Sequence, residues 1–245
     1  MSPRVTAATA VRVLTQLRRD PRTVVLLLAV PCVLLILLEE VFAGLPAVFQ
    51  SIGGPLLGLF PFISMFLVTS ITMLRERVSG TLERLMTLPL HKLDILLGYA
   101  IAFALFAAVQ VTLVSVVAFG PLDLRVAGPK WAVVALAVGN AVLGMSLGLF
   151  VSAFATTEFQ AVQFMPALVF PQLLLCGLFV AREDMAEWLQ VISAVLPLTY
   201  AYDALAKVSA GGPYGARFVL DVAVTVGATL LFLALGAATL RRRTA

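Results

Sequence analysis

A dense group of side chains that could do chemistry lies in one stretch, residues 74–94, with the sequence LRERVSGTLERLMTLPLHKLD. This charged segment holds three arginines, a lysine, three acids and the only histidine of the chain, between two apolar runs. Arginines and carboxylates can form charge-assisted hydrogen bonds with a partner. Catalysis would need a nucleophile with a base, or clustered acids that hold a metal. Because the apolar runs contain neither, we interpret the charged segment as a site of ionic recognition.

The pattern inside the charged segment predicts a short amphipathic helix. Gly80 can serve as its N-cap, and Glu83 at the third helical position can meet free amide donors. Three apolar side chains share one face of this helix: Leu82, Leu85 and Met86. Pro89 stops the helix. Such a helix could rest on lipid headgroups or present its charges to a protein.

The composition assigns the chain to a class. Hydrophobic residues make up 61% and charged residues 12% of the 245 residues, and the mean hydropathy is +1.05. These values are typical of an integral membrane protein. The net charge of +4 does not indicate nucleic-acid binding, since the basic excess sits where membrane topology requires it. Cys32 and Cys176 both lie in apolar runs, so neither a disulfide nor a metal site is predicted.

Six apolar runs are predicted to cross the membrane as helices: residues 23–38, 55–74, 95–120, 131–154, 161–181 and 222–240. The first run is short, contains Pro31 and ends at two glutamates. Glycines and prolines between residues 41 and 54 predict a loop before the second span.

The distribution of lysine and arginine predicts the orientation. Six spans place both termini on one side, and that side then carries twelve of these residues against five on the other. Cytoplasmic loops are the richer ones in Lys and Arg. We therefore expect the two termini, an N-terminal amphipathic segment at residues 1–22 and the charged segment to be cytoplasmic.

Two stretches carry a family resemblance. RERVSGTLERLMTLPLHKLDILLG resembles the R-E-x-x-x-G-T-L-E-x-L-x-x-x-P signature of type-2 ATP-binding-cassette (ABC) permeases, a group that exports drugs, polysaccharides and lipids. Residues 143–205 are similar to the family's fourth and fifth spans and its outer helices, and include the element PLTY at residues 197–200. The resemblance covers nearly the whole chain. It implies one permease domain, residues 1–245, with six transmembrane helices, a cytoplasmic coupling helix and short outer amphipathic or re-entrant helices.

The resemblance also implies site residues and partners. In the family, the loop corresponding to residues 75–94 docks on the ATPase subunit. The implied coupling residues are Arg75, Glu76, Gly80, Thr81, Leu82, Glu83, Arg84 and Pro89. No G-x-x-x-x-G-K-[ST] phosphate loop occurs in the sequence. We therefore expect this chain to bind no cofactor, and ATP and Mg²⁺ to be used by a separate ATPase. A homodimer or a second permease subunit is also implied.

The outer segment, residues 182–215, has mixed character. Apolar residues at helical spacing follow an acidic start, which favours a short amphipathic helix and then a partly re-entrant one. In the resembling family these outer helices form an extracellular gate. The implied gate residues are Trp188, Pro197, Tyr200, Tyr202 and Asp203. A helix that simply rests on the outer leaflet is the alternative.

The expected function is export. We expect a permease subunit in the plasma membrane, in contact with lipid, that moves a hydrophobic or amphiphilic compound out of the cell. The scarcity of ionisable residues within the spans disfavours a proton- or sodium-driven transporter. Two alternatives stay open: an ATPase-coupled complex that senses or regulates without transport, and an intramembrane enzyme.

Overall fold

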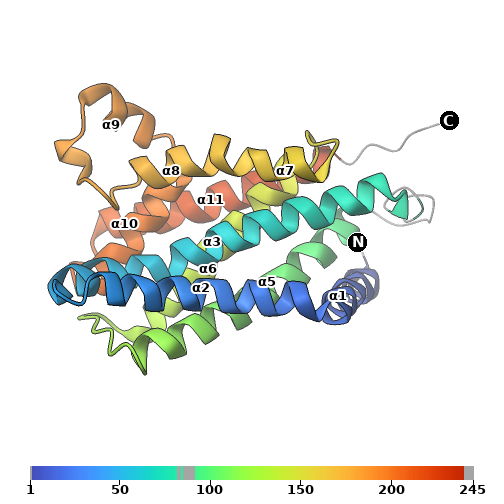
Figure 1. The fold of residues 1–245 in the computed structure, drawn as a ribbon. Helices are drawn as coiled ribbons and strands as arrows, with labels where there is room; N and C mark the ends of the chain where they lie inside the picture. The colour runs from blue at the N-terminus through green and yellow to red at the C-terminus, as the bar shows by residue number, and fades with distance from the viewer. Residues whose placement is uncertain (1, 82–83, 85–91, 240–245) are drawn as a thin grey trace.

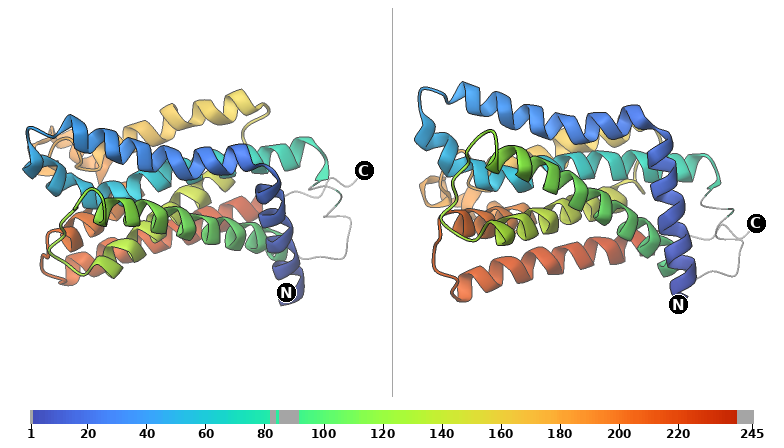
Figure 2. Two further views of the ribbon diagram at one scale, coloured as in Figure 1. Left: turned by 60° about the horizontal axis from the view of Figure 1, so that its bottom comes forward. Right: turned by 90° about the horizontal axis from the view of Figure 1, so that it is seen from below.

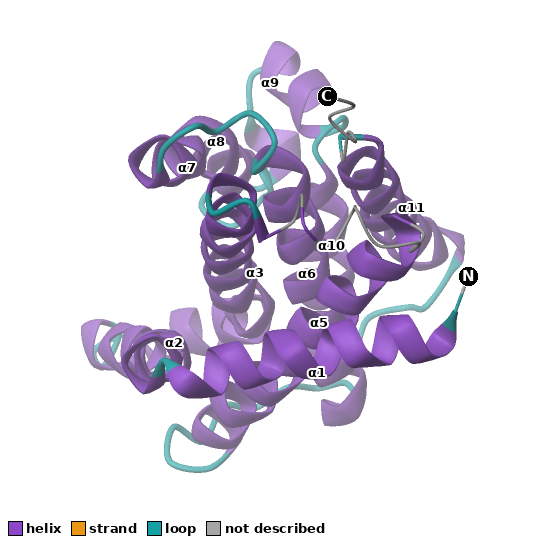
Figure 3. Ribbon diagram, turned by 90° about the vertical axis from the view of Figure 1, so that its right-hand side faces the viewer, coloured by secondary structure: helices purple, strands orange, loops and turns teal. Residues whose placement is uncertain are grey.

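The computed structural model describes residues 2–81, 84 and 92–239, and every element in this part of the chain is a helix. Most of the long helices run side by side as a bundle (Figure 1). One helix, α1 (Pro3–Arg19), lies across one end of the bundle (Figure 3). We call this end, where α3 (Pro46–Val78) ends and α5 (Lys92–Phe119) begins, the α1 end. The opposite end, near α9 (Glu187–Ser193), is the α9 end.

Helix α1 is amphipathic, and its buried face is spaced at helical periodicity: Thr9, Ala10, Val13 and Leu17. Asp20 separates α1 from α2 (Pro21–Val41), and its carboxylate accepts hydrogen bonds from the backbone N–H of Thr23 at 3.2 Å and its hydroxyl at 2.6 Å. This cap and the proline that starts α2 fix a sharp change of direction between the two helices (Figure 2).

Helix α3 (Pro46–Val78) begins earlier than the sequence predicted. The expected loop at residues 41–54 is wrong beyond Leu45, because Pro46 occupies the first helical turn and the helix continues through Pro55 and Pro61. The glycines that suggested a loop instead allow close packing. A Cβ placed on Gly53 would lie 2.5 Å from the side chain of Leu124.

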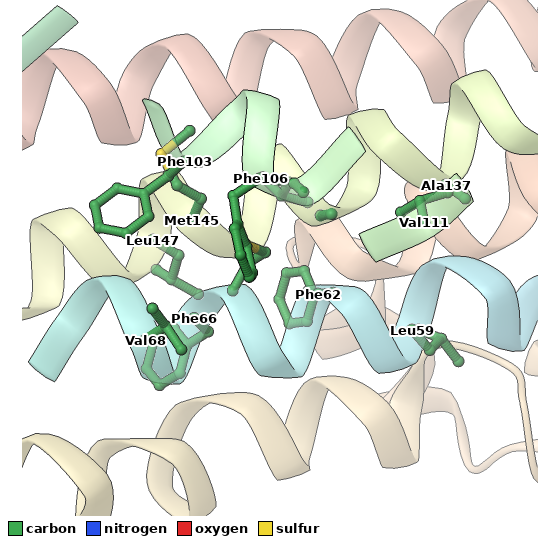
Figure 4. Close-up of a cluster of buried hydrophobic side chains, with 14 of the residues drawn as sticks. Leu59, Phe62, Phe66, Val68, Phe103, Phe106, Val111, Ala137, Met145 and Leu147 are labelled. Atoms are coloured by element: carbon green, nitrogen blue, oxygen red, sulfur yellow. The ribbon is translucent and has the colours of Figure 1, made fainter. Parts of the chain in front are cut away.

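Helices α5 (Lys92–Phe119) and α6 (Lys130–Val151) follow the predicted spans closely. Among the helices that the structure describes, α6 and α3 share the most extensive contact. Large apolar side chains from α3, α5 and α6 meet there, among them Phe62, Phe66, Phe103, Phe106 and Met145 (Figure 4). This core joins the three helices along the middle of the bundle.

The fifth predicted span is an interrupted helix. α7 (Glu158–Phe164), the π-helical η1 (Met165–Val169) and α8 (Phe170–Leu175) follow one another without a gap, alongside α3 (Figure 1). Two prolines, at residues 166 and 171, remove backbone donors and account for the π-helical turn. The prediction extended this span to residue 181, but it ends at Leu175, before Gly177 at φ +105°.

The outer segment contains the 3₁₀ turn η2 (Arg182–Asp184), α9 (Glu187–Ser193) and α10 (Pro197–Ser209). α9 and α10 meet at a bend of 89°. α9 projects from the bundle, whereas α10 turns back and packs on α3, α6 and α11 (Ala216–Ala238) (Figure 1). Helices are therefore present where the sequence predicted the two outer ones.

Within the described residues, five helices are long and apolar enough to cross a membrane: α2, α3, α5, α6 and α11. The bent pair α9 and α10 would make six if it is one span. The exposed surfaces of α2 and α11 are rich in aliphatic side chains, as a lipid-facing surface requires. The chain is thus an all-α integral membrane protein.

Candidate functional site

The α1 end of the bundle contains a buried polar cluster. Arg12 of α1 donates to the Glu76 carboxylate at 3.3 Å, and Gln16 donates to the same carboxylate at 3.2 Å. Arg12 also donates to the hydroxyl of Tyr99 on α5. Glu76 is 6% exposed and Tyr99 is fully buried. The predicted coupling residue Glu76 therefore pairs within the chain, and its carboxylate links α3 to α1.

Helix α1 is held equally closely to the start of α5. The backbone N–H of Ser2 donates to the Asp94 carboxylate at 3.0 Å, and Asp94 is 1% exposed. Further along, a Cβ placed on Gly98 would lie 2.5 Å from the Cβ of Thr9, so only glycine permits this approach. The two helices that flank residues 82–91, α3 and α5, are thus both fastened to α1.

Arg75 has a different partner from Glu76 and forms a two-point ion pair with Glu158 at the start of α7. Its Nε and Nη2 atoms donate to the two carboxylate oxygens at 2.7 and 2.9 Å. These hydrogen bonds hold the pKa of Glu158 below its ordinary value. Both side chains remain more than half exposed. Arg75 also lines a cavity of about 370 Å³ between α1 and the end of α3.

Gly80 marks the end of α3. It has φ +70°, the left-handed conformation that favours glycine after a helix. Its carbonyl accepts from the backbone N–H of Arg84 at 3.0 Å, and Thr81 and Arg84 are helical, which fits the predicted helix start at Gly80. Leu82, Glu83 and Pro89 lie outside the described residues. Of the eight predicted coupling residues, five are thus placed, all at the α1 end.

The Arg75–Glu158 pair predicts a pH dependence. Because the folded-state pKa of Glu158 is lowered, the stabilisation is present above the unfolded-state pKa, about 4.3, and is lost as pH falls through the folded-state value. The thermal midpoint of wild type should exceed that of Arg75→Gln slightly at pH 6, and the difference should shrink as the pH is lowered below 4. A difference that is equally large at pH 6 and below pH 4 would contradict the assignment.

At the α9 end, the predicted gate residues occupy the outer segment. Trp188 projects from α9 and is 65% exposed. Pro197 starts α10, and the hydroxyl of Tyr200 donates to the carbonyl of Ala194 at 2.7 Å, across the bend between the two helices. Ser193 also donates to the carbonyl of Leu175 at 2.8 Å. These bonds fix the bend, so Tyr200 and Pro197 position the outer segment while Trp188 faces outward.

Tyr202 and Asp203 line a second cavity, of about 430 Å³, at the same end. Asp203 forms ion pairs with Arg182 at 3.2 Å and Arg217 at 3.9 Å. The ring of Tyr202 lies against Gly177, where a Cβ would be 3.2 Å from it. The five predicted gate residues therefore divide between the bend, the exposed face of α9 and this polar cavity.

Sequence reasoning missed several polar side chains. At the α1 end these are Arg12, Gln16, Asp94 and Tyr99; at the α9 end they are Arg182, Lys207, Arg217 and Asp221. Arg12 and Gln16 are four residues apart on the amphipathic segment and so share a helix face, a signal that was available. The others meet across elements distant in sequence, and no local pattern predicts such pairs.

The family model of the ABC-2 type transporter matches residues 5–209 of the chain. The "Probable multidrug ABC transporter permease YbhR" of Escherichia coli (strain K12) is 30% identical over 152 residues, 60% of this chain and 40% of the relative. The "Probable doxorubicin resistance ABC transporter permease protein DrrC" of Mycobacterium tuberculosis (strain ATCC 25618 / H37Rv) is 27% identical over 212 residues, 82% of this chain and 75% of the relative.

A third relative is "ABC transporter G family member 20" of Dictyostelium discoideum, 27% identical over 154 residues. The match spans 63% of this chain but only 21% of that relative. The family match takes in α2 to α10, including both the helices that flank residues 82–91 and the outer segment. The chain therefore belongs to the ABC-2 type transporter family.

Proposed function

We propose that this chain is the permease subunit of an ATP-driven exporter that works with a separate ABC ATPase. The observation that carries the proposal is the family match over residues 5–209. Relatives named for multidrug and doxorubicin resistance support a hydrophobic or amphiphilic substrate. The apolar core, with mostly uncharged polar groups inside the spans, favours the same class of compound.

We assign the contact with the ATPase to residues 75–89. Arg75 is 61% exposed along its side chain, so it can exchange Glu158 for an acidic group of a partner at little cost. Glu76 is buried, and we assign it an indirect role, in which motion of the charged segment passes through its carboxylate to α1. The sequence signature is the reason to keep four further residues in this assignment: Leu82, Glu83, Arg84 and Pro89.

The remaining parts of the proposal concern topology and assembly. The excess of Lys and Arg near the α1 end supports a cytoplasmic location for both termini, in the plasma membrane. The bend between α9 and α10 and the cavity at Tyr202 and Asp203 support an outer gate. A second copy of the chain, or a paired permease subunit, would complete the pathway.

Charge reversal in the charged segment tests the assignment. Glu83→Lys places a like charge beside Arg84 and weakens the helix start, and reversal at a desolvated interface costs about 2–5 kcal/mol. We expect loss of ATPase co-purification and of ATP-driven doxorubicin efflux from proteoliposomes, with unchanged membrane abundance. Gly80→Val should act similarly, because its φ of +70° strains any β-branched residue.

Arg125→Glu is the matched control. It also reverses a charge, but in the exposed ion pair of Arg125 with Asp123 at the α9 end. It should leave ATPase binding and efflux at wild-type level. Wild-type ATPase binding and efflux in both Glu83→Lys and Gly80→Val would show that the charged segment is only an interfacial anchor. If the wild-type permease bound the ATPase but exported no lipophilic compound, the export function would be wrong and a regulatory complex would be the better assignment.

A further inference from the structure

The cavity at the α9 end is bordered by an ion-pair network that joins three segments. Arg182 of the outer segment pairs with Asp203 of α10, and Asp203 lies 3.9 Å from Arg217 of α11. Arg217 in turn lies 3.5 Å from Asp221, which also accepts from Lys207. Asp221 is fully buried and Arg182 is about one-fifth exposed. The network therefore contains three cations and two carboxylates.

The two arginines that line this cavity have more donors than the network satisfies. A guanidinium group offers five N–H donors. In the described part of the chain, the Nε of Arg182 is buried without a hydrogen-bond partner. Arg217 reaches its carboxylates only at 3.5 and 3.9 Å, beyond the length of a charge-assisted hydrogen bond, about 2.7–2.9 Å. Both groups thus retain capacity to bind an additional anion.

Exposed apolar residues are neighbours in sequence of two cavity residues, Ala181 and Arg217. Phe179 and Val180 directly precede the cavity residue Ala181 and are 68% and 48% exposed. Leu220 lies three residues after Arg217, on the same side of α11, and is 45% exposed. Exposed apolar side chains beside a cationic cavity suit a molecule with an apolar body and an anionic end.

We propose that the cavity between Arg182 and Arg217 binds the oxyanion headgroup of an anionic amphiphile. Planar guanidinium groups match phosphate and carboxylate geometry through parallel N–H donors, and two of them border this site. The volume of about 430 Å³ is in the range of ordinary ligand pockets. Glu183 also lines the cavity, but it is exposed, so water and salt screen its repulsion.

The test measures binding to the purified permease alone and does not depend on ATP or on the proposed export. Binding of phosphatidylglycerol and of phosphatidylcholine with the same acyl chains is compared by native mass spectrometry from neutral detergent, and inorganic phosphate is titrated calorimetrically. We expect phosphatidylglycerol to bind tightest. Arg182→Gln and Arg217→Gln should each weaken it about tenfold, the loss of one charge-assisted contact.

Two further variants sharpen the test. Glu183→Gln should strengthen phosphatidylglycerol binding only slightly, because the like charge that it removes at the rim is largely screened. Arg125→Gln removes an arginine from an exposed ion pair at the same end of the bundle and should have no effect. Since Arg217 is 58% exposed, Arg217→Gln remains informative even if Arg182→Gln does not fold.

Wild-type affinity for phosphatidylglycerol in both arginine variants would overturn the proposal. If phosphatidylcholine bound as tightly as phosphatidylglycerol, the proposed selectivity of the cavity for an anionic headgroup would be wrong. Inorganic phosphate binding as tightly as phosphatidylglycerol would show a free-anion site and remove the amphiphile from the assignment. The proposal is supported if wild type binds phosphatidylglycerol more tightly than phosphatidylcholine and inorganic phosphate, and if Arg182→Gln and Arg217→Gln each weaken that binding.

Discussion

Replacing Glu76 by alanine is expected to destabilise the permease by about 3 kcal/mol, the usual cost of leaving one partner of a buried ion pair alone. Arg12 would lose its carboxylate while its guanidinium stays beside the buried ring of Tyr99, and Gln16 would lose its acceptor. Unfolding in mixed micelles, followed by circular dichroism, gives the free energy. Because α1 then loses its link to α3, ATP-driven efflux should fall as well.

The exposed pair Arg75–Glu158 provides the comparison. A double-mutant cycle at Arg12 and Glu76 should give a coupling energy of about 2 kcal/mol, whereas a cycle at Arg75 and Glu158 should give about 1 kcal/mol or less. Each pair has one member near the end of α3, and these two differ in burial, with Glu76 at 7% and Arg75 at 61% side-chain exposure. Equal coupling energies in the two cycles would refute the buried link between α1 and α3.

The sequence predicted the architecture well where the signal was local. Apolar length located the spans that correspond to α2, α3, α5, α6 and α11, but not the interruption of the fifth. Gly80, predicted as a helix start, has φ +70°, a conformation that favours glycine. Glycine elsewhere misled the prediction. Gly53 and Gly54 suggested a loop, yet they lie inside α3 where Leu124 and Ser209 approach closely. A glycine that permits close packing and a glycine that ends a helix look the same in sequence.

The candidate sites were only half predictable, for a similar reason. The sequence located the charged segment but could not show that Glu76 and Arg75, adjacent in the chain, point to different partners 64 and 83 residues away. The ion pairs of Asp203 with Arg182 and Arg217 likewise depend on the bend between α9 and α10. Pairing across helices follows from packing, which residue types alone do not determine.

Gly144→Ala is expected to cost about 3 kcal/mol, at the upper end of the usual range for overpacking. A Cβ on Gly144 would overlap the carbonyl oxygen of Phe62 and lie 2.9 Å from its carbonyl carbon. These are backbone atoms of α3, so no side-chain rotation can relieve the collision. Helices α3 and α6 must separate, and their interface is the most extensive in the bundle.

Gly139→Ala in the same helix is the matched control. A Cβ there meets no atom within 4 Å, and alanine in a helix is favoured over glycine by about 0.5–1 kcal/mol. The two substitutions are chemically identical, five residues apart in α6, and should shift the free energy of unfolding in micelles in opposite directions. Gly148→Ala should follow Gly144→Ala, since its Cβ would lie 2.5 Å from the carbonyl oxygen of Phe66. If Gly144→Ala is as stable as Gly139→Ala, the close approach of α3 and α6 does not hold the bundle together, and the core in Figure 4 must carry that role alone.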